Sequence, residues 1–277
     1  MQTEINGDDR LSVPQRLSYL GVNFVRNLRQ GNARLRRESF QAARLQRTPT
    51  AASPSRALTE AFIYGRLPAM LPLGKVRVLE IGCGSGSLTR ILAEIGYSGQ
   101  YVGVDIDDRF DHTVQPGFEK TFVHTDVNQF KPEGKFDLVI SVSALEHIPN
   151  DHQITKRLAG FVGSGGLQLH FVPSGWALLV YLWHGYRQYT AFSLAERFDP
   201  QETSFFAMGG GASFLLHFLF ITVGDLLLPL RLRQRLPWLY GRLLDGCLKL
   251  DRIVPVCATF YAVCQFSAPV PESTIHD

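Results

Sequence analysis

The sequence predicts an α/β fold with an open, mostly parallel sheet, and two observations carry that prediction. Apolar runs without alternation, as at 78–81 and 136–142, are typical of parallel strands that are buried on both faces. A segment with leucine and isoleucine at helical spacing, residues 88–95, follows the first run. At 277 residues and 45% hydrophobic composition, the chain is long enough for one such domain with additions.

A glycine-rich turn joins the first strand to this helix. The sequence VLEIGCGSGSLTRIL, residues 78–92, places Gly82, Gly84 and Gly86 after the apolar run. Glycine lets the backbone turn tightly and approach a ligand with no Cβ in the way. The free N–H groups at the start of the helix face the same crevice. These features predict a cofactor site at the carboxyl end of the first strand.

The spacing within the turn distinguishes two cofactor classes. The dinucleotide motif G-x-G-x-x-G/A needs glycine or alanine where Ser87 stands. The sequence instead has an acidic residue followed by G-x-G-x-G, which resembles the first motif of the class I S-adenosylmethionine-dependent methyltransferases. The resemblance implies that S-adenosylmethionine is the cofactor and that five residues of this turn bind it, namely Glu80, Gly82, Cys83, Gly84 and Gly86.

Downstream segments extend the resemblance over about residues 70–173. Asp105 lies near the end of the apolar run YVGVDID, where a carboxylate can accept hydrogen bonds from both ribose hydroxyls. Asp126 follows a third apolar segment, where methyltransferases of this class place an acidic residue against the adenine amino group. The expected cofactor site is completed by Ile106, Val127 and Ser143. The resemblance also implies a Rossmann-like sheet whose last strand, within 258–269, runs antiparallel to the others.

The chain is expected to divide into four segments. Residues 1–56 would form an N-terminal basic helical arm and linker, and 57–173 the S-adenosylmethionine-binding core. Residues 174–257 would form an apolar and aromatic helical insertion before the last strand. Residues 258–277 would supply the last core strand and a tail. The insertion is therefore expected within one domain.

The N-terminal arm is predicted to be disordered over its first dozen residues and helical over about 14–47. Apolar residues recur there at helical spacing, at Leu17, Leu20, Phe24 and Leu28. Residues 1–57 also hold ten arginines, no lysine and four acidic residues. Two interpretations stay open: a helical cap over the sheet, or a basic amphipathic segment that touches anionic lipid or an anionic substrate.

The insertion contains two kinds of segment. The nearly all-apolar stretch 212–223 is shorter than the roughly 20 residues that span a membrane. Residues 228–250 follow, with arginines among leucines and Trp238, a composition typical of a segment that lies on a membrane face. The alternative is a helical lid over the active site with a basic, solvent-facing side.

His147 is the candidate catalytic base. In the resembling family the loop that follows the fourth strand, here 143–147, faces the methyl donor. A base near the attacking oxygen assists methyl transfer to a hydroxyl group. Alternatively, Glu146 and His147 start the next helix and only orient the loop. No metal is expected, because the Glu-x-x-Glu-His motif of metal-binding relatives has Ser143 in its first position.

A second polar cluster follows the fifth strand, where the acceptor pocket of such a fold lies. It consists of His184, Tyr186, Arg187 and Tyr189. Arginine among aromatic residues can hold a phosphate or carboxylate, and the rings can stack on a sugar face. Equally, these side chains can satisfy one another within a lid.

Composition indicates the compartment and the partners. Four cysteines form no C-x-x-C pair, and the amino terminus is too polar for a secretory signal. A cytoplasmic protein is expected, in peripheral contact with the inner membrane face. Nucleic acid is not an expected partner, because no RNA-binding module accompanies the basic arm. The sequence does not indicate an oligomeric state.

The expected activity is methylation of a hydroxyl group on a small molecule, a sugar or a lipid-linked glycan. The overall plan is similar to that of methyltransferases associated with bacterial glycan and lipid assembly. Two alternatives remain. A nicotinamide-dependent oxidoreductase would share the strand, the glycine turn and Asp105, and NADH binding would distinguish it. A non-catalytic, membrane-associated S-adenosylmethionine-binding protein would bind the cofactor without turning it over.

Overall fold

An eight-stranded sheet forms the centre of the computed structural model, which describes residues 4–29, 31, 35–40 and 51–267. Its strand order is β1-β7-β8-β6-β5-β2-β3-β4. Every neighbouring pair is parallel except those of β8, which runs antiparallel to both β6 and β7. The strands are β1 (Arg36–Phe40), β2 (Lys75–Ile81), β3 (Ser98–Asp105), β4 (Phe118–His124), β5 (Phe136–Val142), β6 (Val162–Pro173), β7 (Thr203–Met208) and β8 (Phe260–Phe266). The expected open sheet with an antiparallel last strand is confirmed.

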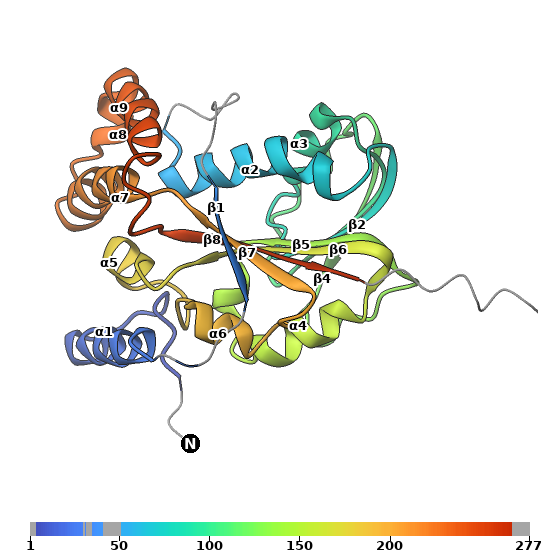
Figure 1. The fold of residues 1–277 in the computed structure, drawn as a ribbon, viewed down its shortest axis with the longest axis horizontal. Coiled ribbons are helices and arrows are strands. Elements are labelled where there is room, and N and C mark those ends of the chain that lie inside the picture. Colours follow the sequence, from blue (N-terminus) through green and yellow to red (C-terminus); the bar gives the residue numbers. More distant parts are fainter. Residues whose placement is uncertain (1–3, 30, 32–34, 41–50, 268–277) are drawn as a thin grey trace, which may run out of the picture.

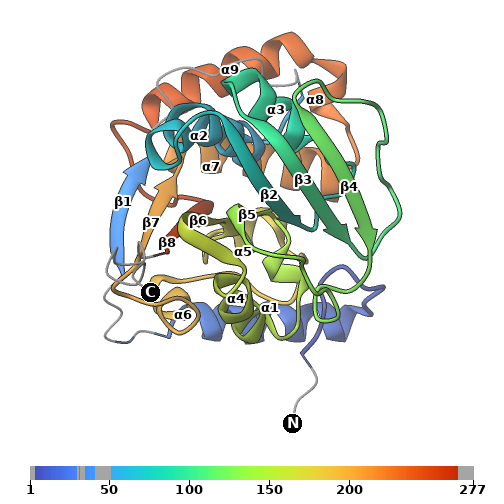
Figure 2. The same cartoon turned by 90° about the vertical axis from the view of Figure 1, so that its right-hand side faces the viewer.

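Helices cover both faces of this sheet (Figures 1 and 2). On one face lie α2 (Pro54–Met70), α3 (Leu88–Ile95), α7 (Gly211–His217), the π-helix η2 (Phe218–Leu227), α8 (Leu232–Arg235) and α9 (Pro237–Leu250). The other face carries α1 (Val13–Asn27), α4 (Asp151–Ala159) and α6 (Ala191–Ala195). Two shorter elements, η1 (Leu145–His147) and α5 (Ala177–Tyr181), follow the carboxyl ends of β5 and β6. This layering buries apolar surface on both sides of the sheet, as the continuous apolar strands predict.

Phe62 of α2 packs strands β1 and β7 against the core. Its side chain is fully buried, and its ring lies 4.9 Å from Phe40 of β1, 5.6 Å from Phe171 of β6 and 5.2 Å from Phe206 of β7. All three contacts are edge-to-face, a favoured arrangement for aromatic pairs. One helix therefore connects strands from three distant parts of the sequence.

One expectation about secondary structure was wrong and another was incomplete. The helix predicted over 14–47 ends at Asn27, and residues 36–40 form the edge strand β1. This strand is rich in charged residues, and only Phe40 is buried, so the sequence has no apolar run that would predict it. The insertion, expected to be helical, contributes β7, to which β1 is paired. The predicted arm and linker, 1–56, and the last segment, 258–277, lie partly outside the described residues.

The apolar stretch at 212–223 forms α7 and part of the π-helix η2. Among the residues that the structure describes, no helix has both the length and the apolar character needed to cross a membrane.

Candidate active site

A pocket of about 370 Å³ opens where β2 ends in the glycine turn. Its wall is formed by the turn itself, by α2 and α3, and by the residues that follow β5. Val142, Ser143 and Tyr181 also line it. The volume suits a small organic ligand, and the position at the carboxyl edge of parallel strands is the usual one in open α/β sheets.

The three glycines of the turn have different reasons to be glycine. All have positive φ, +69° at Gly82, +51° at Gly84 and +75° at Gly86, which other residues rarely adopt. A Cβ at Gly82 would lie 2.5 Å from the Cβ of Ala144, and one at Gly86 would lie 2.6 Å from the ring of Phe122. A Cβ at Gly84 would meet nothing within 4 Å. Gly84 is therefore the position at which the turn borders open space.

Asp105 fixes the shape of the turn. Its Oδ2 accepts a hydrogen bond from the backbone N–H of Gly84 at 2.7 Å, and its Oδ1 accepts one from the N–H of Asp107 at 2.9 Å. The N–H of Thr125 donates to the Asp105 carbonyl oxygen at 2.9 Å. The ends of β3 and β4 are thus joined, with Asp126 just beyond. Ile106, beside them, is 69% exposed.

Asp126 and Val127 begin the loop after β4. The Asp126 Oδ1 accepts hydrogen bonds from the backbone N–H and the side-chain amide of Asn128, at 2.7 and 2.8 Å. Val127 is buried. The structure thus brings the predicted cofactor residues together along the edge formed by β2, β3 and β4.

Glu80 lies under the pocket as a buried carboxyl group. The hydroxyl of Tyr101 donates a hydrogen bond to its Oε2. Burial raises the pKa of Glu80 to about 8, and the negative charge of Asp105 adds to that increase. Cys83, also in the turn, has its thiol pKa raised to about 12 by burial. Most Glu80 side chains are therefore protonated and neutral at neutral pH.

Ser143 connects the pocket to a polar cluster. It has φ +53°, an unusual conformation for a residue other than glycine. Its Oγ donates a hydrogen bond to Glu146 Oε1 at 2.5 Å. Glu146 is fully buried, and its Oε2 has no hydrogen-bond partner. A backbone held this way at the pocket wall is typical of a functional position.

The cluster itself consists of Asp8, Glu146, His147 and His184. Asp8 Oδ2 lies 2.8 Å from His147 Nδ1, and Asp8 Oδ1 lies 3.3 Å from His184 Nδ1. Glu146 Oε1 is 3.6 Å from His184 Nε2 and 3.9 Å from His147 Nε2. Tyr181, which lines the pocket, stacks on His184 with ring centroids 5.2 Å apart. Two imidazoles therefore lie between two carboxylates beside the pocket.

The side chains of this cluster shift one another's pKa values toward the charged forms. Burial alone would lower the pKa of His184, but Asp8 and Glu146 raise it to about 9, so this imidazole is protonated at neutral pH. Burial acts to raise the pKa of Asp8, yet the contacts with His147 and His184 hold it far below its usual range. Asp8 is therefore an anion beside a cation.

Sequence reasoning missed Asp8. The described part of the first dozen residues, 4–12, is tied to the loop after α5, where disorder was expected. The Gly7 N–H donates to the Gly185 carbonyl oxygen at 2.7 Å, and the Gly185 N–H donates to Asp8 Oδ2 at 2.9 Å. No periodicity in the sequence marks this contact. We call residues 4–12 the N-terminal strap.

The same cluster has the ligand types of a metal site. Asp8, His147 and His184 each offer one ligand atom, and these atoms lie within 4.8 Å of one another. Imidazole nitrogen and carboxylate oxygen suit zinc and other first-row divalent ions. The prediction of no metal considered Ser143 and not Asp8, so it remains a prediction.

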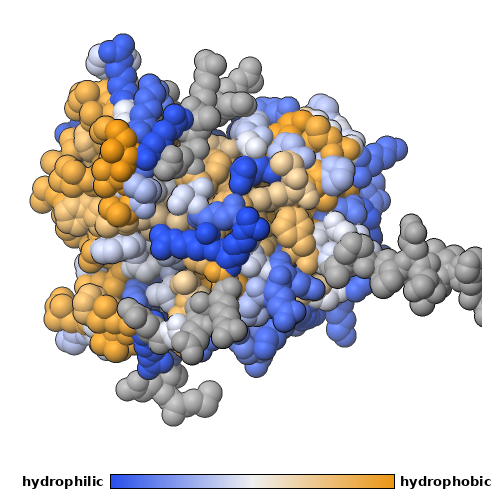
Figure 3. Space-filling model, in the orientation of Figure 1, coloured by the Kyte–Doolittle hydropathy of each residue, from blue (hydrophilic) through white to orange (hydrophobic). Residues whose placement is uncertain are grey.

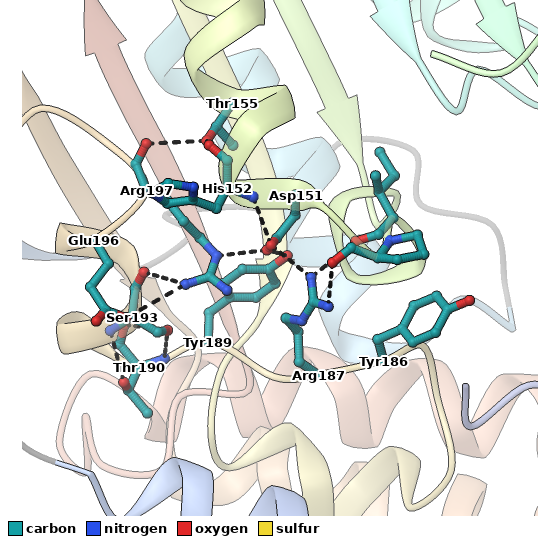
Figure 4. A network of polar contacts seen from close by, with 12 residues as sticks. Asp151, His152, Thr155, Tyr186, Arg187, Tyr189, Thr190, Ser193, Glu196 and Arg197 are labelled. Atoms are coloured by element: carbon teal, nitrogen blue, oxygen red, sulfur yellow. Dashed lines mark hydrogen bonds and ion pairs between the residues drawn. The ribbon is translucent and has the colours of Figure 1, made fainter. Parts of the chain in front are cut away.

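Of the four predicted substrate residues, only His184 belongs to this cluster. Figure 4 shows Arg187 and Tyr189 pointing toward Asp151 at the start of α4. The Arg187 side chain is 3% exposed, lies 2.7 Å from Asp151 Oδ1 and donates to the Ile148 and Pro149 carbonyl oxygens. Tyr189 is fully buried and donates to Asp151 Oδ2 at 2.8 Å. This favours the interpretation that these side chains satisfy one another.

Tyr186 and Arg197 complete the description of this region. The backbone N–H of Tyr186 donates to the Glu146 carbonyl oxygen at 2.7 Å, which places the loop after α5 against η1. Arg197 Nε lies 2.6 Å from Asp151 Oδ2. Asp151 thus joins two arginines and a tyrosine, and this network holds the loop that carries His184.

Comparison with known proteins gives a family. The model of the methyltransferase domain family matches residues 32–200. An uncharacterized methyltransferase of Mycobacterium bovis is 37% identical over 105 residues, 36% of this chain and 52% of that protein. The ubiquinone biosynthesis O-methyltransferase of Shewanella halifaxensis is 32% identical over 97 residues, 32% of this chain and 40% of that protein. The chain thus matches about half or less of the length of these relatives.

A solved structure is similar over most of the chain. The putative sarcosine dimethylglycine methyltransferase of Galdieria sulphuraria superposes with a TM-score of 0.50, at 10% identity, and the match covers 83% of this chain and 94% of that one. At this identity the likeness concerns the fold alone.

We predict that Asp151→Asn destabilises the protein by about 3–5 kcal/mol, because it leaves two arginines without their buried partner. Urea unfolding measures the loss, with Asp245→Asn, an exposed position, as a control that changes stability by less than about 0.5 kcal/mol. An effect of the Asp151 variant as small as the control's would contradict the structural role.

This loss should depend on pH. Burial would raise the pKa of Asp151, but Arg197 and Arg187 lower it overall. A carboxyl group whose pKa is lower in the folded state than in the unfolded state stabilises the protein at pH values above its unfolded-state pKa. This stabilisation is lost as the pH falls through the folded-state pKa. The difference between wild type and variant should therefore shrink below about pH 4.

Proposed function

The chain belongs to the class I S-adenosylmethionine-dependent methyltransferases, and on this premise we propose that it methylates a hydroxyl group of a sugar, a lipid-linked glycan or another small molecule. The observation that carries the proposal is the position of the polar cluster. It adjoins the pocket through Ser143 and Tyr181. A donor pocket and a group of ionisable side chains thus share one wall.

The cofactor would lie along the carboxyl edge of β2, β3 and β4. The methionine part would take the pocket beside Gly84, whose outer side is open. Asp105 would accept the ribose hydroxyls, because each carboxylate oxygen keeps a lone pair beyond the bond it already accepts. Ile106, Asp126 and Val127 would surround the adenine. Once bound, S-adenosylmethionine supplies the methyl group on an activated, positively charged sulfur.

His147 would accept the proton of the acceptor hydroxyl. With Asp8 2.8 Å from Nδ1, the neutral imidazole is favoured with its proton on Nδ1, and Nε2 is left as the basic atom. His184, protonated at neutral pH, offsets the negative charge of Asp8. The protein otherwise contributes alignment of the nucleophile, methyl and sulfur. The other interpretation, in which His147 only orients the loop, predicts no effect on proton transfer.

A hydroxyl acceptor and a membrane location are supported by separate observations. Some relatives that match the core are named O-methyltransferases. The segment 228–250 presents exposed apolar side chains, with Trp238 67% exposed and the Arg242 guanidinium 4.5 Å from its ring centroid. Aromatic and basic residues together are typical of a peripheral contact with lipid head groups. These observations support our proposal that the protein contacts the inner membrane face.

We predict that binding of S-adenosylmethionine releases protons from Glu80 near neutral pH. The ligand brings positive charge into the pocket that Glu80 lines, and this lowers the raised pKa of the carboxyl group. Above about pH 8 the release should disappear, since Glu80 is then ionised without ligand. Calorimetry in phosphate and in Tris measures it as a difference in binding enthalpy.

Two variants make the proton measurement specific. Glu80→Gln should bind with the same enthalpy in both buffers. Glu133→Gln, an exposed control, should keep the wild-type difference. Equal enthalpies for the wild type in both buffers would show that Glu80 does not respond to the ligand.

We predict that His147→Gln lowers kcat by about 10²–10⁴-fold, the usual contribution of general base catalysis, and leaves S-adenosylhomocysteine affinity unchanged. Transfer of a labelled methyl group to a lipid-linked glycan fraction measures the rate. His152→Gln changes an exposed histidine five residues away and should retain activity. Full activity of the His147 variant would show that His147 is not the catalytic base.

The same assay tests the metal prediction. Dialysis against EDTA should leave the wild-type rate unchanged. If the rate falls and an added divalent ion restores it, then Asp8, His147 and His184 hold a metal instead of handling a proton.

A further inference from the structure

Helix α1 presents its apolar side to solvent. Four apolar side chains recur along it at intervals of four, seven and four residues and are between 55 and 70% exposed: Val13, Leu17, Phe24 and Leu28. At 100° per residue this spacing puts them on one narrow stripe. Tyr19 and Asn23, on the other side, are buried. The helix is therefore inverted relative to the usual surface helix, whose apolar stripe faces the core.

The polar side of α1 is fixed to the rest of the protein by specific contacts. The Tyr19 hydroxyl donates to the His184 carbonyl oxygen at 2.7 Å. Arg26 donates to the Tyr186 carbonyl oxygen at 3.2 Å and pairs with Glu4 at 3.0 Å. The orientation of the stripe is thus set by hydrogen bonds. The helix covers this face of the sheet with its polar side, and its apolar stripe points away from the core.

A second exposed apolar surface lies on the same side of the molecule. Figure 1 shows α1, α5 and the α7–α9 group along one end, and Figure 3 shows hydrophobic side chains over both α1 and α7–α9 there. Trp176 and Leu179 lie at and within α5, 48% and 45% exposed. The exposed apolar residues of η2, α8 and α9, with the turns between them, include Leu219, Leu226, Leu227, Leu228, Leu230, Leu236, Trp238, Leu239, Leu243 and Leu250. An exposed apolar surface of this kind marks an interaction site.

Basic residues accompany this apolar surface. Exposed arginines and a lysine lie on or next to the same helices at Arg16, Arg29, Arg231, Arg235, Arg242 and Lys249. Exposed acidic residues on these segments include Asp9 and Asp245, whereas Asp225 is paired with Arg233 at 2.6 Å. The positive excess complements a negatively charged surface.

We propose that α1 together with η2, α8 and α9 forms a docking face for an anionic lipid bilayer. Apolar side chains would enter the head-group region and the basic side chains would contact the phosphates. α1 fixes the position of this face relative to the polar cluster, because it packs directly on the loop that carries His184. The Trp183 indole N–H donates to the Arg16 carbonyl oxygen at 3.4 Å, and Arg16 lies over that ring at 4.7 Å.

The consequence for the substrate rests on the proposed function. The N-terminal strap runs from α1 to Asp8 and thus from the docking face to the polar cluster. A bilayer beneath α1 would therefore lie next to the acceptor side of the active site. An amphiphilic acceptor, anchored in lipid and carrying its hydroxyl at the head-group level, fits this arrangement.

The test is flotation of the full chain with vesicles of phosphatidylcholine alone and with 30% phosphatidylglycerol. We expect binding to the anionic vesicles, reduced several-fold but not abolished at 0.5 M NaCl, because the apolar part is insensitive to salt. Leu17→Glu with Phe24→Glu should lower the partition coefficient at least tenfold. Thr113→Glu with Thr121→Glu adds the same charge on and before β4 and should bind nearly as the wild type does.

Each other outcome has a defined meaning. Circular dichroism and S-adenosylhomocysteine binding should be unchanged in the α1 variant, and Leu17→Ser with Phe24→Ser repeats the test if the glutamates disturb folding. No flotation of the wild type at low salt, or equal flotation of the α1 variant, would overturn the proposal. A dimer in sedimentation that the α1 variant abolishes would assign the face to a second copy of the chain. Flotation needs neither cofactor nor acceptor, so its result is independent of the proposed activity.

Discussion

The hydrogen bond from the Gly84 N–H to Asp105 organises the site. It joins the turn after β2 to the end of β3 at 2.7 Å. Because the turn is held there, Gly82 and Gly86 approach Ala144 and Phe122 so closely that no side chain fits at either position. The one open position, Gly84, borders the pocket. This charge-assisted hydrogen bond thus helps to hold the three glycines in the positions that shape the pocket wall.

The polar cluster depends on a different constraint, the cost of burying Glu146. A fully buried carboxyl group needs polar partners, and the Nε2 atoms of His184 and His147 lie within 4 Å of Glu146 Oε1. Those imidazoles in turn hold Asp8, so the N-terminal strap belongs to the same cluster. Because α1 follows the strap directly, its outward apolar stripe and the polar cluster are parts of one structural unit.

Sequence reasoning was strongest where the signal was local. The glycine turn and Asp105 were predicted because strand, turn and helix follow one another within a short segment. Asp8 was missed because it meets His147 across 139 positions and no periodicity marks it. Arg187 shows another limit: its residue type fits an anionic ligand, but its partner Asp151 already satisfies it. The charged strand β1 could not be recognised, since one buried residue makes no pattern.

The identity of the cofactor is tested most directly by a pair of calorimetric titrations of the wild-type chain, with S-adenosylhomocysteine and with NADH. We expect saturable one-to-one binding of S-adenosylhomocysteine and no heat with NADH. Asp105→Ala should weaken the first titration by roughly 2 kcal/mol, the value of a charge-assisted hydrogen-bonded pair. Saturable NADH binding without a response to S-adenosylhomocysteine would contradict the assignment of S-adenosylmethionine to this pocket.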